Sequence, residues 1–347
     1  MRAGAAAALV LVALAPAGCG GGASSGSSGG TSTSSGSAKP LVVLVTDAGQ
    51  LNDHGFNELA YEGLQRAEAR LGVQGEVFQA ASAQDYIPNL SKAARDKADL
   101  VISVGFDQAD AIAKVAPQFP TTHFAIIDVD QSTLAGKPKN VEGLIFREQE
   151  AGYLAGYLAG LVERGQAGGK NTIGSVGGQK QPPVDRYIAG YQAGARKADP
   201  GVHLLNAYSQ DWVDETKCKQ LALNEMNAGA NIVFQVAGGC GLGVLDAAKQ
   251  KNVWGIGVDA DQAYIGPQVL TSAMKRVDNS VYDTVKQVLA GRFEGGTNAV
   301  FSLANDGVGI GKVSPKVPKA DVAKVDAIAK EIKAGKLTGI PTTVEAS

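Results

Sequence analysis

LVISVGFDQADAIAKV (residues 100–115), followed by THFAIIDVD (122–130), sets out an order of elements that the chain later repeats. An apolar run leads into a glycine-containing loop, the next residues have helical spacing, and a second apolar run ends in aspartate. NIVFQVAGGCGLGVLDAAKQKNVWGIGVDAD (231–261) has the same order and spacing. Two copies of this strand–loop–helix–strand unit predict an α/β protein with two similar halves.

The alternation of strands and helices extends in both directions from these segments. Leu41–Thr46 is a continuous apolar run, as expected of a parallel strand buried on both faces. Further strands are predicted at Glu76–Ala80, Leu100–Val104, Phe124–Asp128, Thr172–Val176, His203–Tyr208, Ile232–Val236 and Trp254–Val258. Helices are predicted at Asn57–Leu71, Ile87–Lys97, Ala109–Ala116, Tyr187–Lys197, Thr216–Ala228 and Gly243–Lys251.

Each half should form an open, doubly wound sheet whose ligand-facing loops lie at the carboxyl ends of its strands. We therefore expect two Rossmann-like lobes that face each other across a hinge and close on a small molecule. The first lobe is expected to contain residues 39–146 and about 273–302, and the second 147–272 and about 303–347. Glu148–Leu161 should begin the second lobe as a helix, in which Gly152, Gly156 and Gly160 allow close helix packing.

The composition of the chain narrows its function class. The sequence has 347 residues, 44% of them hydrophobic, and Lys+Arg 32 against Asp+Glu 34 gives a formal net charge of −2. A basic, nucleic-acid-binding surface is therefore not expected. A disordered chain, a multi-span membrane protein and a small disulfide-stapled protein are excluded as well, but an enzyme is not.

The first residues look like a bacterial lipoprotein signal. Arg2 gives a short positive region, Ala5–Ala15 is an apolar run, and small residues precede Cys19, although Pro16 stands where such signals usually carry an aliphatic residue. We expect a signal peptide at 1–18, lipid modification of Cys19 and a flexible Gly/Ser tether at 19–38. Ordinary signal cleavage, with Cys19 unmodified, is the alternative. The folded part should then lie on the extracytoplasmic face of the cell membrane, held through the lipid anchor only.

Export also affects how the remaining cysteines are interpreted. Cys218 and Cys240 are the two left after Cys19, and such a pair is expected to form a disulfide outside the cytoplasm. Two unpaired buried thiols are the alternative. Metal binding is not expected, because the three histidines lie far from this pair in the sequence and show no ligand spacing.

The loops of the chain resemble those of one known family. VTDAGQLNDHGFNELAYEGL (45–64) resembles the opening motif of the basic membrane protein family, the purine nucleoside receptor lipoproteins. Matching segments follow in the same order, among them GFDQA (105–109), GSVGGQKQPPVDRYIAGYQAG (174–194), GVDADQ (257–262) and TSAMKRVD (271–278). The resemblance implies a type I periplasmic-binding-protein fold and the role of substrate-binding protein for an ABC importer.

A purine nucleoside explains the residue types in these loops. A flat purine ring calls for aromatic faces on both sides, and the resemblance suggests that Phe56 and Tyr187, where the family often has Phe, provide them. Vicinal ribose hydroxyls suit ionised carboxylates as acceptors. The family pattern makes the polar contacts Asp47, Asn57, Asp107, Asp259 and Lys275. Gly238 and Gly239 should let the backbone approach the ligand.

Three other aspartates are expected to have structural roles. Asp128, Asp130 and Asp261 should cap helices or turns. AGGCGLG (237–243) with Asp259 imitates a dinucleotide-binding turn, so an exported enzyme that processes NAD or nucleosides is one alternative, and a ligand-free adhesin is another. We predict a non-enzymatic, monomeric binding protein without cofactor or metal, whose partners are a small ligand and an ABC permease in the membrane, not nucleic acid.

Overall fold

A computed structural model describes residues 38–165 and 170–344. The expected signal peptide, the lipidation at Cys19 and nearly all of the tether lie outside the described residues. None of the helices in the described part of the chain has both the length and the apolar character needed to cross a bilayer.

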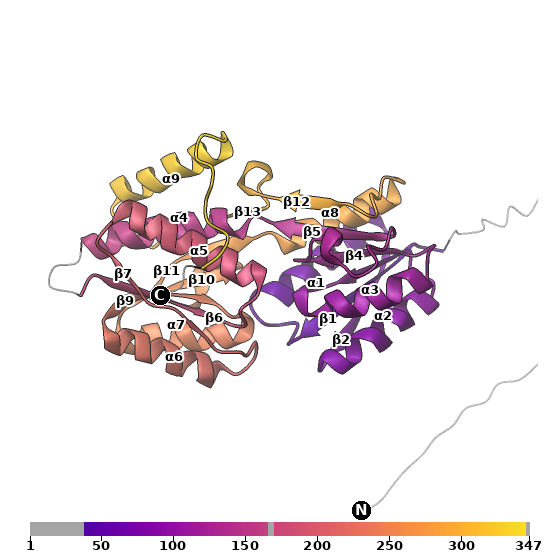
Figure 1. The fold of residues 1–347 in the computed structure, drawn as a ribbon, viewed down its shortest axis with the longest axis horizontal. Coiled ribbons are helices and arrows are strands. Elements are labelled where there is room, and N and C mark those ends of the chain that lie inside the picture. Colours follow the sequence, from indigo (N-terminus) through magenta and orange to yellow (C-terminus); the bar gives the residue numbers. More distant parts are fainter. Residues whose placement is uncertain (1–37, 166–169, 345–347) are drawn as a thin grey trace, which may run out of the picture. The chain divides into compact units, whose positions relative to one another are not determined.

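The first sheet has parallel strands in the order β12-β5-β4-β3-β1-β2. Its strands are β1 (Leu41–Ala48), β2 (Gln74–Ala80), β3 (Leu100–Ser103), β4 (His123–Ile127), β5 (Val141–Phe146) and β12 (Asn298–Phe301). Helices α1 (Phe56–Leu71) and α8 (Val277–Leu289) cover one face, and α2 (Tyr86–Arg95) and α3 (Ala109–Val115) cover the other. The sheet and these helices are called the first lobe here (right half of Figure 1).

The second sheet follows the order β13-β11-β10-β9-β6-β7, and β8 also pairs with β6. Its strands are β6 (Thr172–Gly177), β7 (His203–Leu204), β8 (Ala207–Tyr208), β9 (Ala230–Val236), β10 (Trp254–Asp259), β11 (Val269–Lys275) and the antiparallel β13 (Val308–Ile310). Helices α4 (Glu148–Arg164) and α5 (Pro182–Ala198) lie on one face and α6 (Glu215–Ala228) and α7 (Leu242–Lys251) on the other, while α9 (Lys319–Lys333) packs against α4. These elements form the second lobe.

The two sheets share one topology, which determines where a ligand site can form. In the first lobe β1 lies between β2 and β3, and in the second lobe β6 lies between β7 and β9, so the strand order reverses beside β1 and beside β6. Ligands bind outside the carboxyl ends of parallel strands at such a switch point. The doubly wound two-lobed fold predicted from the sequence is confirmed.

The chain passes from one lobe to the other after strands β5 and β11. Strand β5 leads through Arg147 into α4, which packs on the second lobe, and β11 leads through Arg276 into α8, which packs on α1 of the first. The crossing segments are tied together, because Arg147 N–H donates to the Phe301 carbonyl (2.8 Å) and Arg276 N–H donates to the Gly307 carbonyl (2.9 Å). Each lobe is therefore completed by a helix that follows a strand of the other.

Close packing of α4 against α5 depends on the spaced glycines of α4. A Cβ added at Gly156 would lie 1.9 Å from the Tyr191 carbonyl oxygen, and one at Gly152 would lie 2.2 Å from that of Tyr187. The prediction that these glycines serve helix packing is confirmed.

Two element predictions need correction. The strand predicted at His203–Tyr208 is split into β7 and β8, because the Ser175 hydroxyl bonds to the Asn206 side chain where the pairing is interrupted. Helix α5 begins at Pro182, five residues before the predicted start at Tyr187. Proline suits the first turn of a helix, where its missing N–H leaves no bond unmade.

Candidate functional site

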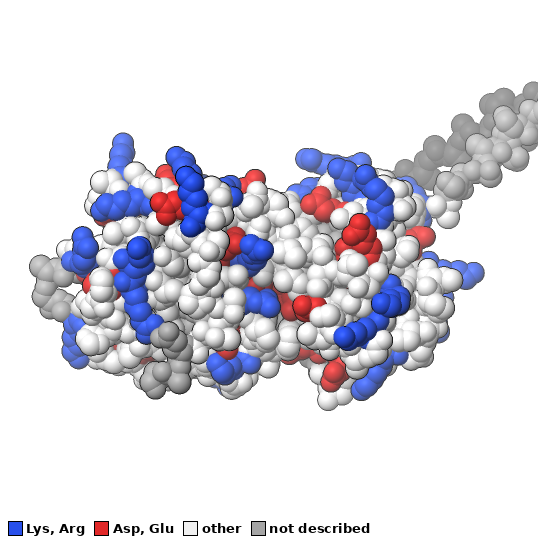
Figure 2. All heavy atoms as spheres, turned by 45° about the horizontal axis from the view of Figure 1, so that its top comes forward, with Lys and Arg blue, Asp and Glu red and all other residues white. Residues whose placement is uncertain are grey.

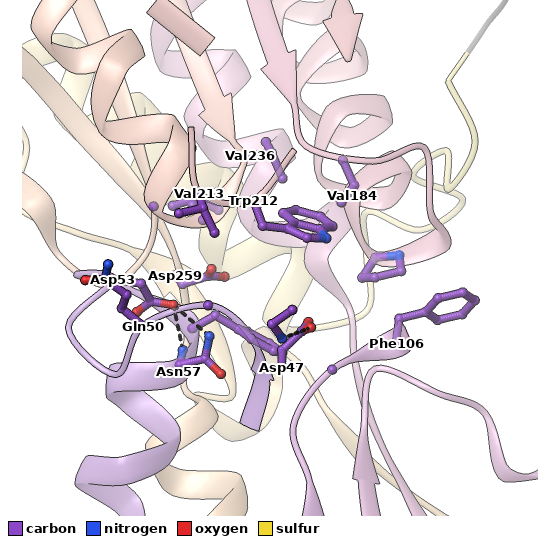
Figure 3. A pocket seen from close by; sticks show the side chains of 18 of the residues that line it. Asp47, Gln50, Asp53, Asn57, Phe106, Val184, Trp212, Val213, Val236 and Asp259 are labelled. Atoms are coloured by element: carbon purple, nitrogen blue, oxygen red, sulfur yellow. Dashed lines mark hydrogen bonds between the residues drawn. The ribbon is translucent and has the colours of Figure 1, made fainter. Parts of the chain in front are cut away.

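A pocket of about 1000 Å³, open solvent at its mouth included, lies where the carboxyl ends of the two sheets face each other. In Figure 3, Asp47, Asp53 and Asn57 of the first lobe lie across the pocket from Trp212, Val213 and Val236 of the second. Both lobes therefore contribute to one site, as the topology requires.

Asp47 is placed at the end of β1, beside the switch point of the first lobe. Its Oδ1 accepts a hydrogen bond from the Tyr86 hydroxyl (2.8 Å). Burial raises the pKa of Asp47 to about 6. The Tyr86 hydroxyl opposes this increase, and the charges of Asp107 and Asp128 add to it. Gly105 leaves room for this carboxylate, since a Cβ there would lie 2.5 Å from Asp47 Oδ2.

The start of α1 supplies the next group of pocket residues. Asp53 accepts hydrogen bonds from the backbone N–H groups of Gly55 (3.0 Å) and Asn57 (2.9 Å), which fixes the first turn of the helix. Asn57 Nδ2 also donates to Asp53, whereas the buried Asn57 Oδ1 has no hydrogen-bond partner. Phe56 and Asn57 both line the pocket, so an aromatic ring and an amide side chain lie next to each other at the start of α1.

Two aspartates, Asp128 and Asp259, occupy equivalent positions in the lobes. Asp128 follows β4, and Asp259 is the last residue of β10. Both have a positive φ, 73° for Asp128 and 62° for Asp259, and both line the pocket. The ammonium of Lys275 lies 2.6 Å from Asp128 Oδ1 and 3.0 Å from Glu148 Oε1. Asp128 lies in a turn after β4, as expected, and in addition it forms a buried ion pair between the lobes, which was not predicted.

Lys275 is a buried cation, with 2% of its surface exposed, at the end of β11. Burial alone would lower its pKa, but the carboxylates of Asp128, Glu148 and Asp259 hold the pKa above its ordinary value. Its Nζ also lies 5.1 Å from the ring centroid of Phe56. Lys275 therefore stays charged and links the carboxylates of both lobes to the aromatic side of the pocket.

Tyr187 is connected to Asp259. The Tyr187 hydroxyl donates to Asp259 Oδ1 (3.1 Å), and its ring meets Phe234 edge-on at 6.0 Å between centroids. Burial raises the pKa of Asp259 to about 7, with Asp128 and Asp53 adding to the effect and Lys275 and the Tyr187 hydroxyl opposing it. The hydroxyl that distinguishes this tyrosine from the phenylalanine of the family pattern thus bonds to a carboxylate at the pocket.

The loop after β8 provides an aromatic residue that sequence reasoning missed, Trp212. Its indole lies on Gly178, where a Cβ would be 2.2 Å from the ring, and its carbonyl accepts from the Cys240 N–H (2.9 Å). The predicted disulfide between Cys218 and Cys240 is present and joins α6 to this backbone. Periodicity could not reveal Trp212, because SQDWVDE (209–215) has none.

Asp107 lies at the edge of the pocket and is not among the residues that line it. Its carboxylate accepts from Gln181 Nε2 (2.5 Å) and from Trp212 Nε1 (3.3 Å), both in the second lobe. A further cross-lobe bond runs from Gln262 Nε2 to the His54 carbonyl (3.0 Å).

Most of the predicted site residues are thus brought together. The pocket lining includes Asp47, Phe56, Asn57, Tyr187, Gly238, Gly239, Asp259 and Lys275. Gly238 has the positive φ of 55° that glycine favours. Asp130 and Asp261 cap short turns through bonds from Ser132 N–H and Ala263 N–H, as predicted.

The charges of the pocket differ from those of the outer surface. On the face shown in Figure 2, Lys and Arg side chains are spread over both lobes between acidic and uncharged ones. The pocket lining instead contains five carboxylates, those of Asp47, Asp53, Asp128, Glu215 and Asp259, together with the ammonium of Lys275. Such a lining offers hydrogen-bond acceptors to a ligand that carries several O–H or N–H groups.

Comparisons with known proteins agree on one family. The model of the family "ABC transporter substrate-binding protein PnrA-like" matches residues 41–339. The chain is 33% identical over 320 residues to the ABC transporter nucleoside-binding protein BmpA of Lactococcus lactis, covering 85% of this chain and 87% of that one. It is 35% identical over 283 residues to an uncharacterised lipoprotein of Pyrococcus abyssi, covering 78% and 69%. A solute-binding protein of an ABC transporter system from Aeropyrum pernix superposes with a TM-score of 0.78 at 25% identity, covering 87% and 94%.

Proposed function

The chain belongs to the PnrA-like family of ABC transporter substrate-binding proteins, and we propose that its ligand is a purine nucleoside bound between the lobes. As a member of this family it is a binding protein for a small ligand and a partner of a membrane permease, not an enzyme. The observation that carries the nucleoside proposal is the pairing, in one pocket, of the Phe56 ring with the carboxylates of Asp47 and Asp259. The name of the Lactococcus lactis relative supports it.

In this proposal the two parts of the nucleoside contact different residues. The base lies against Phe56, and the neighbouring side chain of Asn57, which also lines the pocket, contacts its polar edge. The ribose hydroxyls donate to Asp259, whose Oδ1 already accepts from Tyr187, and Lys275 holds the surrounding carboxylates in place. Asp47, Gly238 and Gly239 complete the contacts.

We further propose that the protein is anchored on the extracytoplasmic face of the membrane through a lipid on Cys19 and acts as a monomer. The lipoprotein name of the Pyrococcus abyssi relative and the signal-like first residues support the anchor. Metabolic labelling with a palmitate analogue tests it. Labelling should disappear in Cys19→Ala, and labelling of that variant would contradict the proposal.

The ligand proposal is tested by a thermal-shift screen of the purified protein. A ligand that binds only the folded state stabilises it by about 2.7 kcal/mol at a concentration of 100 Kd, so a clear rise in Tm is expected with guanosine, inosine or adenosine. Two compounds serve as controls. Free ribose lacks the base, and NAD adds charged phosphates. No shift with any purine nucleoside, or a larger shift with NAD, would contradict the proposal.

Phe56→Ala tests the aromatic contact. Removing the ring should weaken binding of every purine nucleoside by about 1–3 kcal/mol, because the apolar area that covers the base is lost. Calorimetric titration with ribo- and deoxyribonucleosides measures this. A loss that depends on the sugar and not on the base would contradict the stacking role.

A further inference from the structure

Asp107 connects the two lobes through side chains that line the pocket. It lies in the turn Phe106–Gln108 after β3 of the first lobe, and both of its side-chain partners, Gln181 and Trp212, come from the second. Each of these partners lines the pocket, whereas Asp107 does not. A contact of Asp107 with the ligand is therefore indirect in this arrangement.

Trp212 is held rigidly within its own lobe. Its ring lies against Gly178, and its carbonyl accepts from Cys240, which the disulfide joins to Cys218 of α6. The indole N–H is the part of Trp212 that extends to the first lobe, where it meets Asp107 Oδ2 at 3.3 Å. Because the ring is fixed to the second lobe, this bond can form only when the lobes are together.

Gln181 provides the second bond to Asp107. It is the residue that precedes Pro182 at the start of α5, and its Nε2 lies 2.5 Å from Asp107 Oδ1 and 3.3 Å from Gln179 Oε1. One carboxylate of the first lobe thus accepts bonds on both oxygens from two segments of the second. Bonds to an ionised acceptor are stronger than those between neutral groups.

We propose that Asp107 is a positioning residue for ligand retention: it latches the lobes by holding Gln181 and Trp212 over the pocket, without touching the ligand. The proposal rests on the pocket being the ligand site, and it does not depend on which ligand occupies it. Lobe closure shifts an existing equilibrium between open and closed forms, and the latch favours the closed form.

The first test needs no ligand. The sequence has two tryptophans, so Trp254→Phe, far from the pocket at the start of β10, leaves Trp212 as the single indole. In that background, Asp107→Ala should raise the acrylamide quenching of Trp212 fluorescence, because the ring is no longer covered by the first lobe. Asp110→Ala, which removes an exposed carboxylate of α3 three residues away, is the matched control and should leave quenching unchanged. Equal quenching in the Asp107 and Asp110 variants would overturn the latch.

The second test uses guanosine, inosine and adenosine as probes. Asp107→Ala removes charge-assisted bonds, so it should weaken the binding of each nucleoside about ten- to hundredfold through faster dissociation. The ratios between the three Kd values should stay unchanged. A change in those ratios would show that Asp107 touches the ligand and would overturn the proposal. If the wild type binds no nucleoside, the ligand proposal fails, and the quenching experiment still decides on the latch.

A double-mutant cycle separates positioning from general damage to the fold. In a Gln181→Ala, Trp212→Phe background, both of these donors to Asp107 are gone, so adding Asp107→Ala should have no further effect on the rate of nucleoside dissociation. An additional loss as large as that in the otherwise wild-type chain would show that Asp107 acts through other groups, and it would overturn the proposal.

Discussion

At the scale of single residues, the pocket depends on carboxylates whose ionisation is suppressed by burial. Burial raises the pKa of Asp259 to about 7 and that of Asp47 to about 6, and the buried cation Lys275 forms an ion pair with Asp128. A ligand that donates O–H groups favours the ionised carboxylate. Ligand binding and proton release are therefore coupled.

We expect nucleoside affinity to rise with pH through the pKa of Asp259. Below about pH 7 the ligand must displace a proton from this residue, so affinity should fall up to about tenfold per pH unit on acidification. Calorimetric titrations at pH 6, 7 and 8 measure this. Asp259→Asn should weaken binding by about 1–3 kcal/mol at pH 8 and remove the dependence above pH 6. An unchanged pH profile in that variant would exclude Asp259 from the coupling.

Glu225, in α6 and away from the pocket, should make folding stability depend on pH. Burial raises its pKa to about 8, with the backbone of Ser175 opposing, so the native state retains a proton that the unfolded chain loses near pH 4.5. This stabilisation is fully present below pH 4.5 and is lost as the pH rises through 8. Tm should therefore fall between pH 5 and 8 in the wild type.

Glu225→Gln should show a flatter Tm profile over that range, because the amide does not ionise. Asp246→Asn, which changes an exposed carboxylate of α7, is the control and should keep the wild-type profile. Parallel profiles for wild type and Glu225→Gln would show that another group titrates.

At the scale of elements, α4 and α5 are held together by backbone contacts at glycine. Gly156→Ala should destabilise the protein by about 1–3 kcal/mol or more, since the new Cβ would meet the Tyr191 carbonyl at 1.9 Å and the helices would have to separate. Denaturant unfolding measures the change. Gly165→Ala, where the nearest atom lies 3.4 Å away, should be close to neutral. Equal effects of the two substitutions would contradict this account of the packing.

Also at this scale, strands were predicted better than their connections. Buried parallel strands are continuous apolar runs, so Leu41–Thr46 and Trp254–Val258 could be placed to within two residues from sequence. The start of α5 and the break between β7 and β8 depend on a proline and on the Asn206 side chain, which apolar spacing does not detect.

Site residues on repeated loops could also be predicted, but their long-range partners could not. Lys275 and Asp128 are 147 positions apart, so the sequence around Asp128 suggested the turn in which it lies but gave no sign of the ion pair. The hydroxyl of Tyr187 bonds to Asp259, 72 positions away, and nothing local to either residue indicates this pairing. Such pairings exist only once the two lobes face each other.

At the scale of the whole described fold, function follows from two similar lobes that present their switch points to one pocket. Helices α4 and α8 each follow a strand of one lobe and pack on the other, so the lobes can close without either core being broken. The cross-lobe contacts of Asp107 and Lys275 then stabilise the closed form around the ligand.

Binding of a purine nucleoside through both its base and its sugar is the function that we propose for this pocket. Calorimetric titration of guanosine and inosine into the purified protein at pH 8, compared with Phe56→Ala and Asp259→Asn, tests it most directly. We expect one site per chain, a negative heat-capacity change from burial of the base, and weaker binding in both variants. Absence of binding by the folded wild type, or equal affinity in all three proteins, would contradict it.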